Sequence, residues 1–253
     1  MAQGIFLHSI DMNNEMVCNN FSIPTHISSV MGANAFGFVQ PLPTPLYDCN
    51  PVDLYHSPEK CLDGIISPTG RIILFGGSVR NNRFITNGFG KPWKLTESQK
   101  QSILFKSELE IKWETIRKAE FPTKPSRLTS IFVVENNAEG REVLSHMFYS
   151  LTIQGLYKPF LFDVKPLQVF KFHIGDVQWL DQFDATKDET CIRRYWEGYA
   201  VNNHPLREYL IEGLLCPTER SQVEQFRIES ELAQDSRRYW KDLYAFPYTD
   251  WFS

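Results

Sequence analysis

The amino-acid sequence predicts a single α+β domain, with helices inserted between the strands of a mixed or antiparallel sheet. The chain has 253 residues, of which 42% are hydrophobic and 22% charged, and this composition is typical of one globular core. Runs typical of strands alternate with runs typical of helices, and no internal repeat or low-complexity tract interrupts them. We therefore expect residues 1–253 to form one domain.

The first third of the chain predicts two strands separated by a long irregular segment. Gly4–Ile10 is a short apolar run that ends in polar residues, which is typical of a strand. A series of prolines interrupts residues 19–70, so we expect a long loop there. Arg71–Phe75 is a second apolar run, ended by Gly76 and Gly77, and predicts another strand.

The middle of the chain predicts a helix, a central strand and a second helix. After Thr96, apolar residues recur at helical spacing, and they are Phe105, Leu109, Trp113 and Ile116. Leu128–Glu135 is rich in β-branched and aromatic residues and predicts a strand. Asn136 or Asn137 is then suited to cap a helix over Ala138–Leu151.

The last third predicts further strands and a helical tail. Pro159–Val164 and Leu167–Ile174 are β-like runs, which indicate either a hairpin or one bent strand. A short aromatic helix is expected over Val177–Phe183, and a strand over Glu208–Ile211. The C-terminal residues 217–253 begin with a charge-rich helical pattern.

Charge and cysteine content exclude several classes of protein. The formal net charge is -4, so no electrostatic footprint favours nucleic acid as a partner. The five cysteines contain no Cys-x-x-Cys pair, so we expect neither a disulfide framework nor a zinc site. No basic leader and no apolar stretch of membrane-spanning length is present, which favours a cytoplasmic protein without a membrane partner.

Familiar nucleotide and catalytic motifs are also missing from the sequence. No Gly-x-Gly-x-x-Gly follows a strand-like run, and neither a P-loop nor a Gly-x-Ser-x-Gly elbow occurs. The remaining histidines show no spacing that suits a metal ion. A dinucleotide would therefore have to bind outside a Rossmann-type site.

Three segments in chain order carry a candidate function. They are Phe-Leu-His-Ser at residues 6–9, Ser-Arg-Leu-Thr-Ser-Ile-Phe at 126–132 and Glu-Tyr-Leu-Ile-Glu-Gly at 208–213. Together they resemble the signature of the ADP-ribosyltransferase superfamily, in which a first strand bears His or Arg, a second bears Ser, Thr or Tyr, and a late strand bears Glu. They are also similar to bacterial domains of unassigned function. The resemblance implies the split sheet of that superfamily.

The resemblance assigns a role to each candidate residue, with NAD+ as the substrate. Glu208 would be the catalytic carboxylate, because cleavage of the nicotinamide bond builds positive charge on the ribose. His8 and Ser9 would contact the adenosine ribose and the nicotinamide amide, respectively. Thr129 or Ser130 would form the wall under the nicotinamide ribose. Arg127 would bind the pyrophosphate.

Several alternatives stay open at the level of sequence. Glu212 lies four residues after Glu208, so on a strand the two share one face and either could be the catalytic carboxylate. Leu206 stands where arginine-directed members carry Glu or Gln, so transfer to arginine is not expected. The chain is expected to modify a protein or another macromolecule, or to hydrolyse NAD+. There are two rival hypotheses. The chain is either a catalytically silent binding domain of this fold or an unrelated α+β domain.

Overall fold

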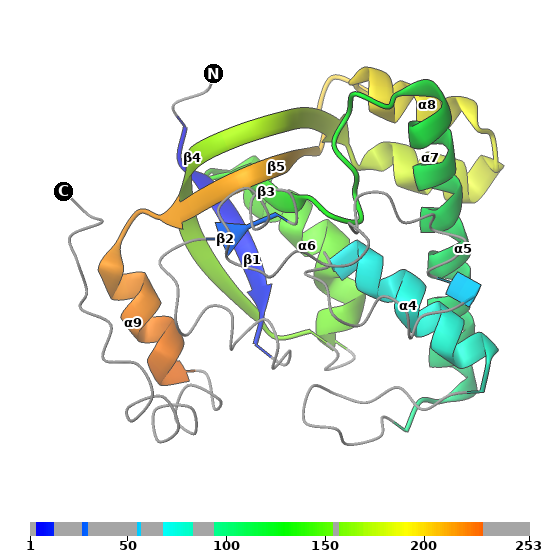
Figure 1. Ribbon diagram of the computed structural model, residues 1–253, viewed down its shortest axis with the longest axis horizontal. Helices are drawn as coiled ribbons and strands as arrows, with labels where there is room; N and C mark the ends of the chain where they lie inside the picture. The colour runs from blue at the N-terminus through cyan, green and yellow to red at the C-terminus, as the bar shows by residue number, and fades with distance from the viewer. Residues whose placement is uncertain are drawn as a thin grey trace, which may run out of the picture.

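The computed structural model describes residues 4–12, 27–29, 55–56, 68–82, 94–153 and 157–229, and these form an α+β fold (Figure 1). The strands are β1 (Phe6–Asp11), β2 (Ile27–Ser28), β3 (Ile131–Glu135), β4 (Pro159–Asp176) and β5 (Arg207–Pro217). The helices are α4 (Pro68–Arg80), α5 (Glu97–Glu120), α6 (Ala138–Ile153), α7 (Gln178–Thr186), α8 (Thr190–Glu197) and α9 (Arg220–Glu229). Most of the predicted loop at 19–70 and of the tail at 217–253 lies outside the described residues.

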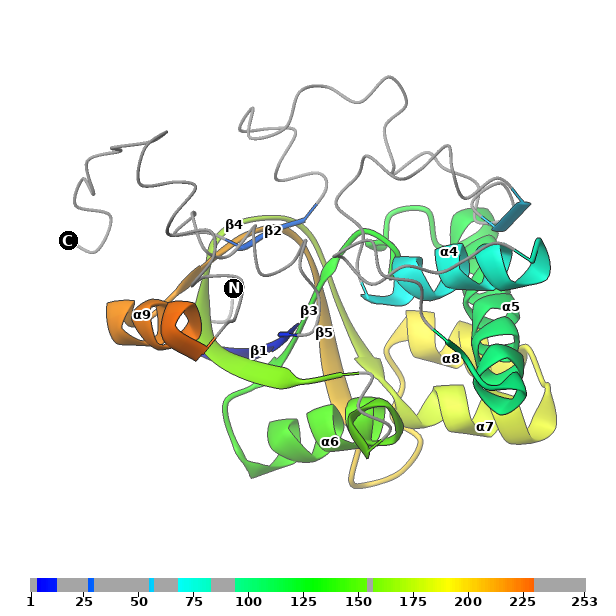
Figure 2. The same cartoon turned by 90° about the horizontal axis from the view of Figure 1, so that it is seen from below.

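The sheet is antiparallel and closes on itself through its longest strand. Its five strands follow the order β2-β5-β3-β1-β4, and β4 also pairs with β5. The first part of β4 pairs with β1 and the rest pairs with β5, so that Val164 lies opposite both Phe6 and Pro217. Figure 2 shows the resulting ring of strands, with α6 below β1 and the helices α5, α7 and α8 to one side. The sheet therefore has an inner and an outer face.

Apolar clusters on the two faces hold the strands and helices together. The inner cluster takes side chains from all five strands, and α9 adds Val223 and Phe226 to it. On the outer face, Leu7 and Val134 pack against Val143 of α6. A third cluster joins Leu210 of β5 to α5, α7 and α8, and its buried residues are Trp113, Ile116, Phe183, Cys191, Ile192, Tyr195, Trp196 and Leu210.

The first long helix forms where its local signals predict it. Thr96 caps α5, because its side chain accepts a hydrogen bond from the Gln99 amide while the Gln99 side chain accepts one from the Thr96 amide. Trp113 and Ile116 of the predicted stripe are buried, which confirms that this face packs on the domain. Phe105 departs from the stripe, because 43% of its surface is exposed and its ring lies under the Lys187 ammonium.

The prediction of a strand at Arg71–Phe75 is wrong, because these residues belong to helix α4. A short apolar run carries no period that distinguishes a buried helix from a strand. Gly76 allows the close packing of α4 on α5, since a Cβ atom there would lie 2.0 Å from the Ser107 hydroxyl. Ser107 in turn donates a hydrogen bond to the Ile72 carbonyl, at 2.7 Å.

The structure confirms the bent-strand alternative for one strand prediction and shortens another predicted strand. Pro159–Val164 and Leu167–Ile174 form a single bent strand, β4, and its pairing with β5 shifts register at Pro166/Gln168 and at Val169/Lys171. The predicted strand Leu128–Glu135 begins only at Ile131, because residues 127–130 form a turn.

Within the described ranges, no helix has both the length and the apolar character that are needed to cross a membrane.

Candidate functional site

The predicted catalytic carboxylate, Glu208, lies in a buried charge network. Its side chain is shielded from solvent on the outer face of β5, where its Oε1 accepts hydrogen bonds from Arg127 Nη1 and from the Tyr195 hydroxyl. Arg127 also donates to both carboxylate oxygens of Glu110, at 3.1 and 3.2 Å, and to the Tyr195 hydroxyl, at 2.9 Å. The turn that carries Arg127 thus meets α5, α8 and β5 at the Arg127 guanidinium. We call Glu110, Arg127, Tyr195 and Glu208 the Arg127 network.

Aromatic rings close this network off from solvent. The Arg127 guanidinium lies 5.9 Å from the Trp113 ring centre, 5.1 Å from that of Phe132 and 5.4 Å from that of Tyr195. Burial raises the pKa of Glu208, although Arg127 and Tyr195 act in the opposite direction. Arg127 therefore serves to neutralise buried carboxylates, and neither it nor Glu208 is open to a dinucleotide.

The structure does not bring His8 and Glu208 into one cleft, which corrects that expectation. His8 lies two residues from both Phe6 and Ile10 on β1, so its side chain is on the same face of the sheet as theirs. It also lies opposite Phe162, and all three neighbours belong to the inner cluster. Glu208 lies two residues from Leu210 on β5, so it shares the face of Leu210, which packs on the outer face. Which face a strand residue occupies depends on pairing register, and spacing along the sequence does not reveal it.

The two candidates on β1, His8 and Ser9, each contact a different neighbouring residue. The His8 Nδ1 atom lies 2.7 Å from the Phe132 carbonyl oxygen, and burial lowers the pKa of His8 to about 4. Ser9 is on the outer side of β1, where its hydroxyl lies 2.7 Å from that of Tyr157. His8 is therefore uncharged at neutral pH and hydrogen-bonded to the backbone of β3.

The second-segment hydroxyls and the other candidate carboxylate, Glu212, are all buried. Thr129 and Ser130 lie in the turn before β3, and neither hydroxyl has a hydrogen-bond partner among the described residues. The β3–β5 pairing begins with Ile131 opposite Ile211, so Ser130 precedes the paired residues. Glu212 is itself buried, its Oε1 accepts from the Ser126 amide at 3.2 Å, and its Oε2 lies in ionic contact with Lys171 Nζ, 3.3 Å away.

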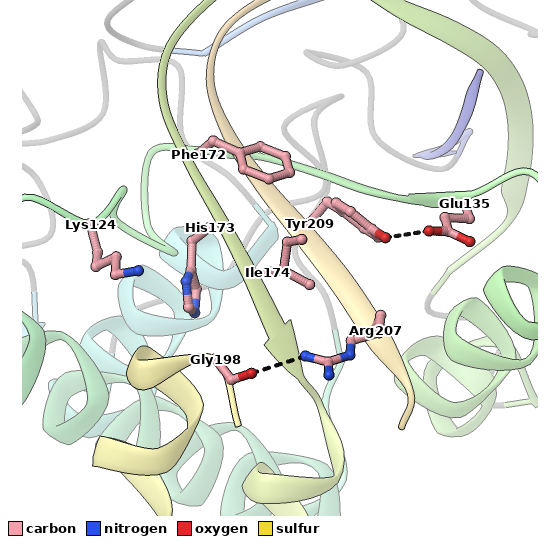
Figure 3. A pocket seen from close by; sticks show the side chains of 8 residues that line it. All are labelled: Lys124, Glu135, Phe172, His173, Ile174, Gly198, Arg207 and Tyr209. Carbon is pink, nitrogen blue, oxygen red and sulfur yellow. Dashed lines mark hydrogen bonds between the residues drawn. The ribbon is translucent and has the colours of Figure 1, made fainter. Parts of the chain in front are cut away.

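An open hollow of about 550 Å³ lies at the end of the β4–β5 pair. Its lining comprises Lys124, Glu135, Phe172, His173, Ile174, Gly198, Arg207 and Tyr209. Figure 3 shows these side chains on both sides of β4, with Lys124 and His173 on one side and Tyr209 and Arg207 on the other. The lining combines two cations, two aromatic rings, one imidazole and one carboxylate, so the hollow suits an anionic ligand that carries flat rings.

The one carboxylate that lines the hollow, Glu135, is exposed and oriented at both of its oxygen atoms. Its Oε1 accepts a hydrogen bond from the Tyr209 hydroxyl (Figure 3). Its Oε2 accepts one from Asn137 Nδ2 at 2.9 Å. Burial and then the hydrogen bond to Glu135 raise the pKa of Tyr209, so the phenol stays protonated and remains a donor.

His173 connects the hollow to the Arg127 network. Its Nε2 lies 3.0 Å from the Tyr195 carbonyl oxygen, and its ring packs on those of Tyr195 and Trp196. Burial, followed by the positive charge of Lys124, lowers the pKa of His173 to about 3. The imidazole is therefore neutral, and its Nε2 donates to the carbonyl.

Sequence reasoning expected a loop after Gly198 but did not assign Gly198 and Arg207, which flank it, to a site. Asp176, at the end of β4, is fully buried and accepts hydrogen bonds from the backbone amides of Gln178, Val201 and Leu206. Gly198 ends α8 with a φ of 85°, a conformation that favours glycine. Arg207 Nη1 donates to the Gly198 carbonyl at 3.1 Å. The signal that the sequence offers for this arrangement is an acidic residue, Asp176, just after a strand-like run.

Metal binding has no support in the part of the chain that the structure describes. There, no three His, Cys, Asp or Glu side chains are grouped so as to hold an ion.

Comparison with known proteins identifies one family model, described as "Protein of unknown function (DUF2441)", which matches residues 93–222. No curated protein matches the sequence. The matched segment runs from just before α5 into α9 and contains the whole lining of the hollow together with the Arg127 network. It leaves out β1, and with it His8 and Ser9.

Proposed function

The chain belongs to the DUF2441 family, and we propose that it is an ADP-ribosyltransferase-like enzyme that binds NAD+ in the hollow beside β4 and β5. The observation that carries this proposal is the lining of the hollow, which combines Glu135, an exposed, oriented carboxylate, with two cations and two aromatic rings. The three-segment resemblance supplies the reaction class. The hollow replaces the predicted cleft between His8 and Glu208 as the binding site.

The chemistry of NAD+ fits the groups that line the hollow. Its pyrophosphate is anionic and suits Arg207 and Lys124, whose ammonium and guanidinium groups are not ion-paired with any carboxylate among the described residues. Its flat rings suit the faces of Phe172 and Tyr209. A volume of about 550 Å³ is within the range of small-molecule sites.

Glu135 is the proposed catalytic carboxylate. Cleavage breaks the bond between the ribose C1′ and the nicotinamide nitrogen, and the electron pair leaves with nicotinamide. The positive charge that develops on the ribose is stabilised by a fixed carboxylate nearby. A nucleophile of the acceptor, or water, then bonds to C1′ and releases its proton. We propose a protein as the acceptor, since the net charge of -4 does not favour nucleic acid.

A second candidate is a catalytically silent domain that binds NAD+ or a related nucleotide. The burial of Glu208 in the Arg127 network favours it, because the late-strand carboxylate that the resemblance designates for catalysis is then unavailable.

Release of labelled nicotinamide from NAD+ by the purified chain tests the proposal. We expect Glu135→Gln to lower the rate by about 100-fold, because the amide removes the negative charge and keeps the shape. Glu139→Gln is the matched control, since Glu139 is an exposed acid in the first turn of the adjacent helix α6. A Glu135→Gln variant that retains the wild-type rate would contradict the assignment. Wild-type binding of NAD+ without any release would favour the silent domain.

A further inference from the structure

Tyr209 is held in place by its backbone and by its ring. Its backbone lies near the start of β5, opposite Val133 of β3 on one side and Ile174 of β4 on the other. Its ring packs against Phe6, with the ring centres 5.2 Å apart, and against Phe172, with the centres 5.7 Å apart. Only 7% of its surface is exposed. The hydroxyl of Tyr209 is therefore a fixed point at the mouth of the ring of strands.

The carboxylate of Glu135 takes its orientation from that fixed point and from one other. Besides Tyr209, Asn137 Nδ2 donates to it, at 2.9 Å. The Asn137 amide is itself fixed, because its Oδ1 accepts from the Gly140 amide at 2.7 Å, at the start of α6. An exposed glutamate at a strand end would otherwise sample several rotamers.

We infer that Tyr209 is a positioning residue, which aims the Glu135 carboxylate into the hollow by donating a hydrogen bond to it. This inference rests on the proposed function for its catalytic consequence, while the geometry of the pair stands without it. Tyr209 acts through Glu135 and transfers no proton, because its phenol remains protonated.

The other polar groups near the pair do not depend on the Tyr209 hydroxyl. Arg207 of β5 lines the same hollow, as do Lys124 after α5 and His173 of β4, and Asp163 of β4 is hydrogen-bonded to the neighbouring Asn136. Replacing Tyr209 by Phe leaves these groups in place and removes only the hydroxyl. The Glu135 carboxylate then loses one of the two donors that orient it.

The test compares Tyr209→Phe with the matched control Tyr199→Phe, since 53% of the Tyr199 surface is exposed and it does not line the hollow. In protein with ¹³C-labelled glutamate, we expect the NMR order parameter of the Glu135 side chain to fall in Tyr209→Phe and to stay unchanged in the control, because one of its two orienting donors is lost. An unchanged order parameter in a folded Tyr209→Phe protein overturns the inference.

Nicotinamide release separates this inference from the proposed function. We expect Tyr209→Phe to lower kcat by about tenfold and to leave KM for NAD+ within about twofold. A loss confined to KM would show that Tyr209 only contacts the ligand, and would contradict a positioning role. Absence of turnover in the wild type would count against the proposed function alone, because the order parameter of Glu135 still decides the role of Tyr209.

Discussion

The surroundings of individual acidic residues decide which of them is available for chemistry. Glu208 is enclosed, and its Oε1 is shared by Arg127 and Tyr195, so it is engaged inside the fold and is not available to a ligand. Glu135 is exposed, and two neutral donors hold it at the rim of a hollow. Neither difference is visible in the sequence, where Glu208 has the more suggestive neighbours.

Replacing Arg127 tests the structural role of its network. Arg127→Met leaves the buried carboxylates of Glu110 and Glu208 without a cation, so we expect the free energy of unfolding to fall by about 3–5 kcal/mol. Urea denaturation at neutral pH measures this change. In the double variant Arg127→Met with Glu208→Gln, one uncompensated charge is removed, and part of the loss should be recovered. Equal stability of Arg127→Met and the wild type would contradict a network that holds the fold.

At the scale of elements, β4 determines where the site forms. It bends so that its first part pairs with β1 and the remainder with β5, and its end carries Asp176, which holds the loop that contains Gly198. Gly175 lies opposite Glu208, and a Cβ atom there would lie 2.2 Å from the Tyr195 ring. This glycine therefore permits α8 to deliver the Tyr195 hydroxyl to Glu208.

The junction between β4 and α8 gives the fold a predictable pH dependence. The pKa of His173 is lowered to about 3 in the folded protein, against 6.5 as its ordinary value. Below pH 6.5 the unfolded chain gains a proton that the folded chain does not, so the free energy of unfolding falls as the pH falls towards 3. One such group contributes a slope of at most about 1.4 kcal/mol per pH unit.

His173→Gln isolates that contribution. Urea denaturation of the variant and the wild type between pH 7 and 4.5 should give a shallower pH dependence for the variant, because the remaining titrating groups, including Glu208 and His8, are common to both proteins. Parallel pH dependences would show that His173 does not remain neutral in the folded state.

Local signals in the sequence predict the helices better than the site. The helix that begins after Thr96 and the helix after Asn137 follow from patterns among near neighbours, and the structure confirms both. Contacts between distant strands are different, because the pairing register decides that His8 faces inward and Glu208 outward. The helix α8 was overlooked, although its buried residues Cys191, Ile192, Tyr195 and Trp196 recur at a helical spacing.

At the scale of the whole molecule, the ring of strands has an inner and an outer face, and each face packs against different parts of the protein. The inner face is apolar and holds β1 to β5 together, whereas the outer face carries α6 on one part and α5, α7 and α8 on another (Figure 2). The hollow lies where the β4–β5 pair emerges from this arrangement, and its lining belongs to the segment that the family model matches. We therefore expect other members of the family to share the hollow.

Titration of NAD+ into ¹⁵N-labelled protein tests most directly whether the hollow is the binding site. The largest chemical-shift changes are expected at the backbone amides of Gly198, Arg207 and Tyr209, with smaller changes at His173. No change on addition of NAD+, or changes confined to β1 around His8, would contradict the account.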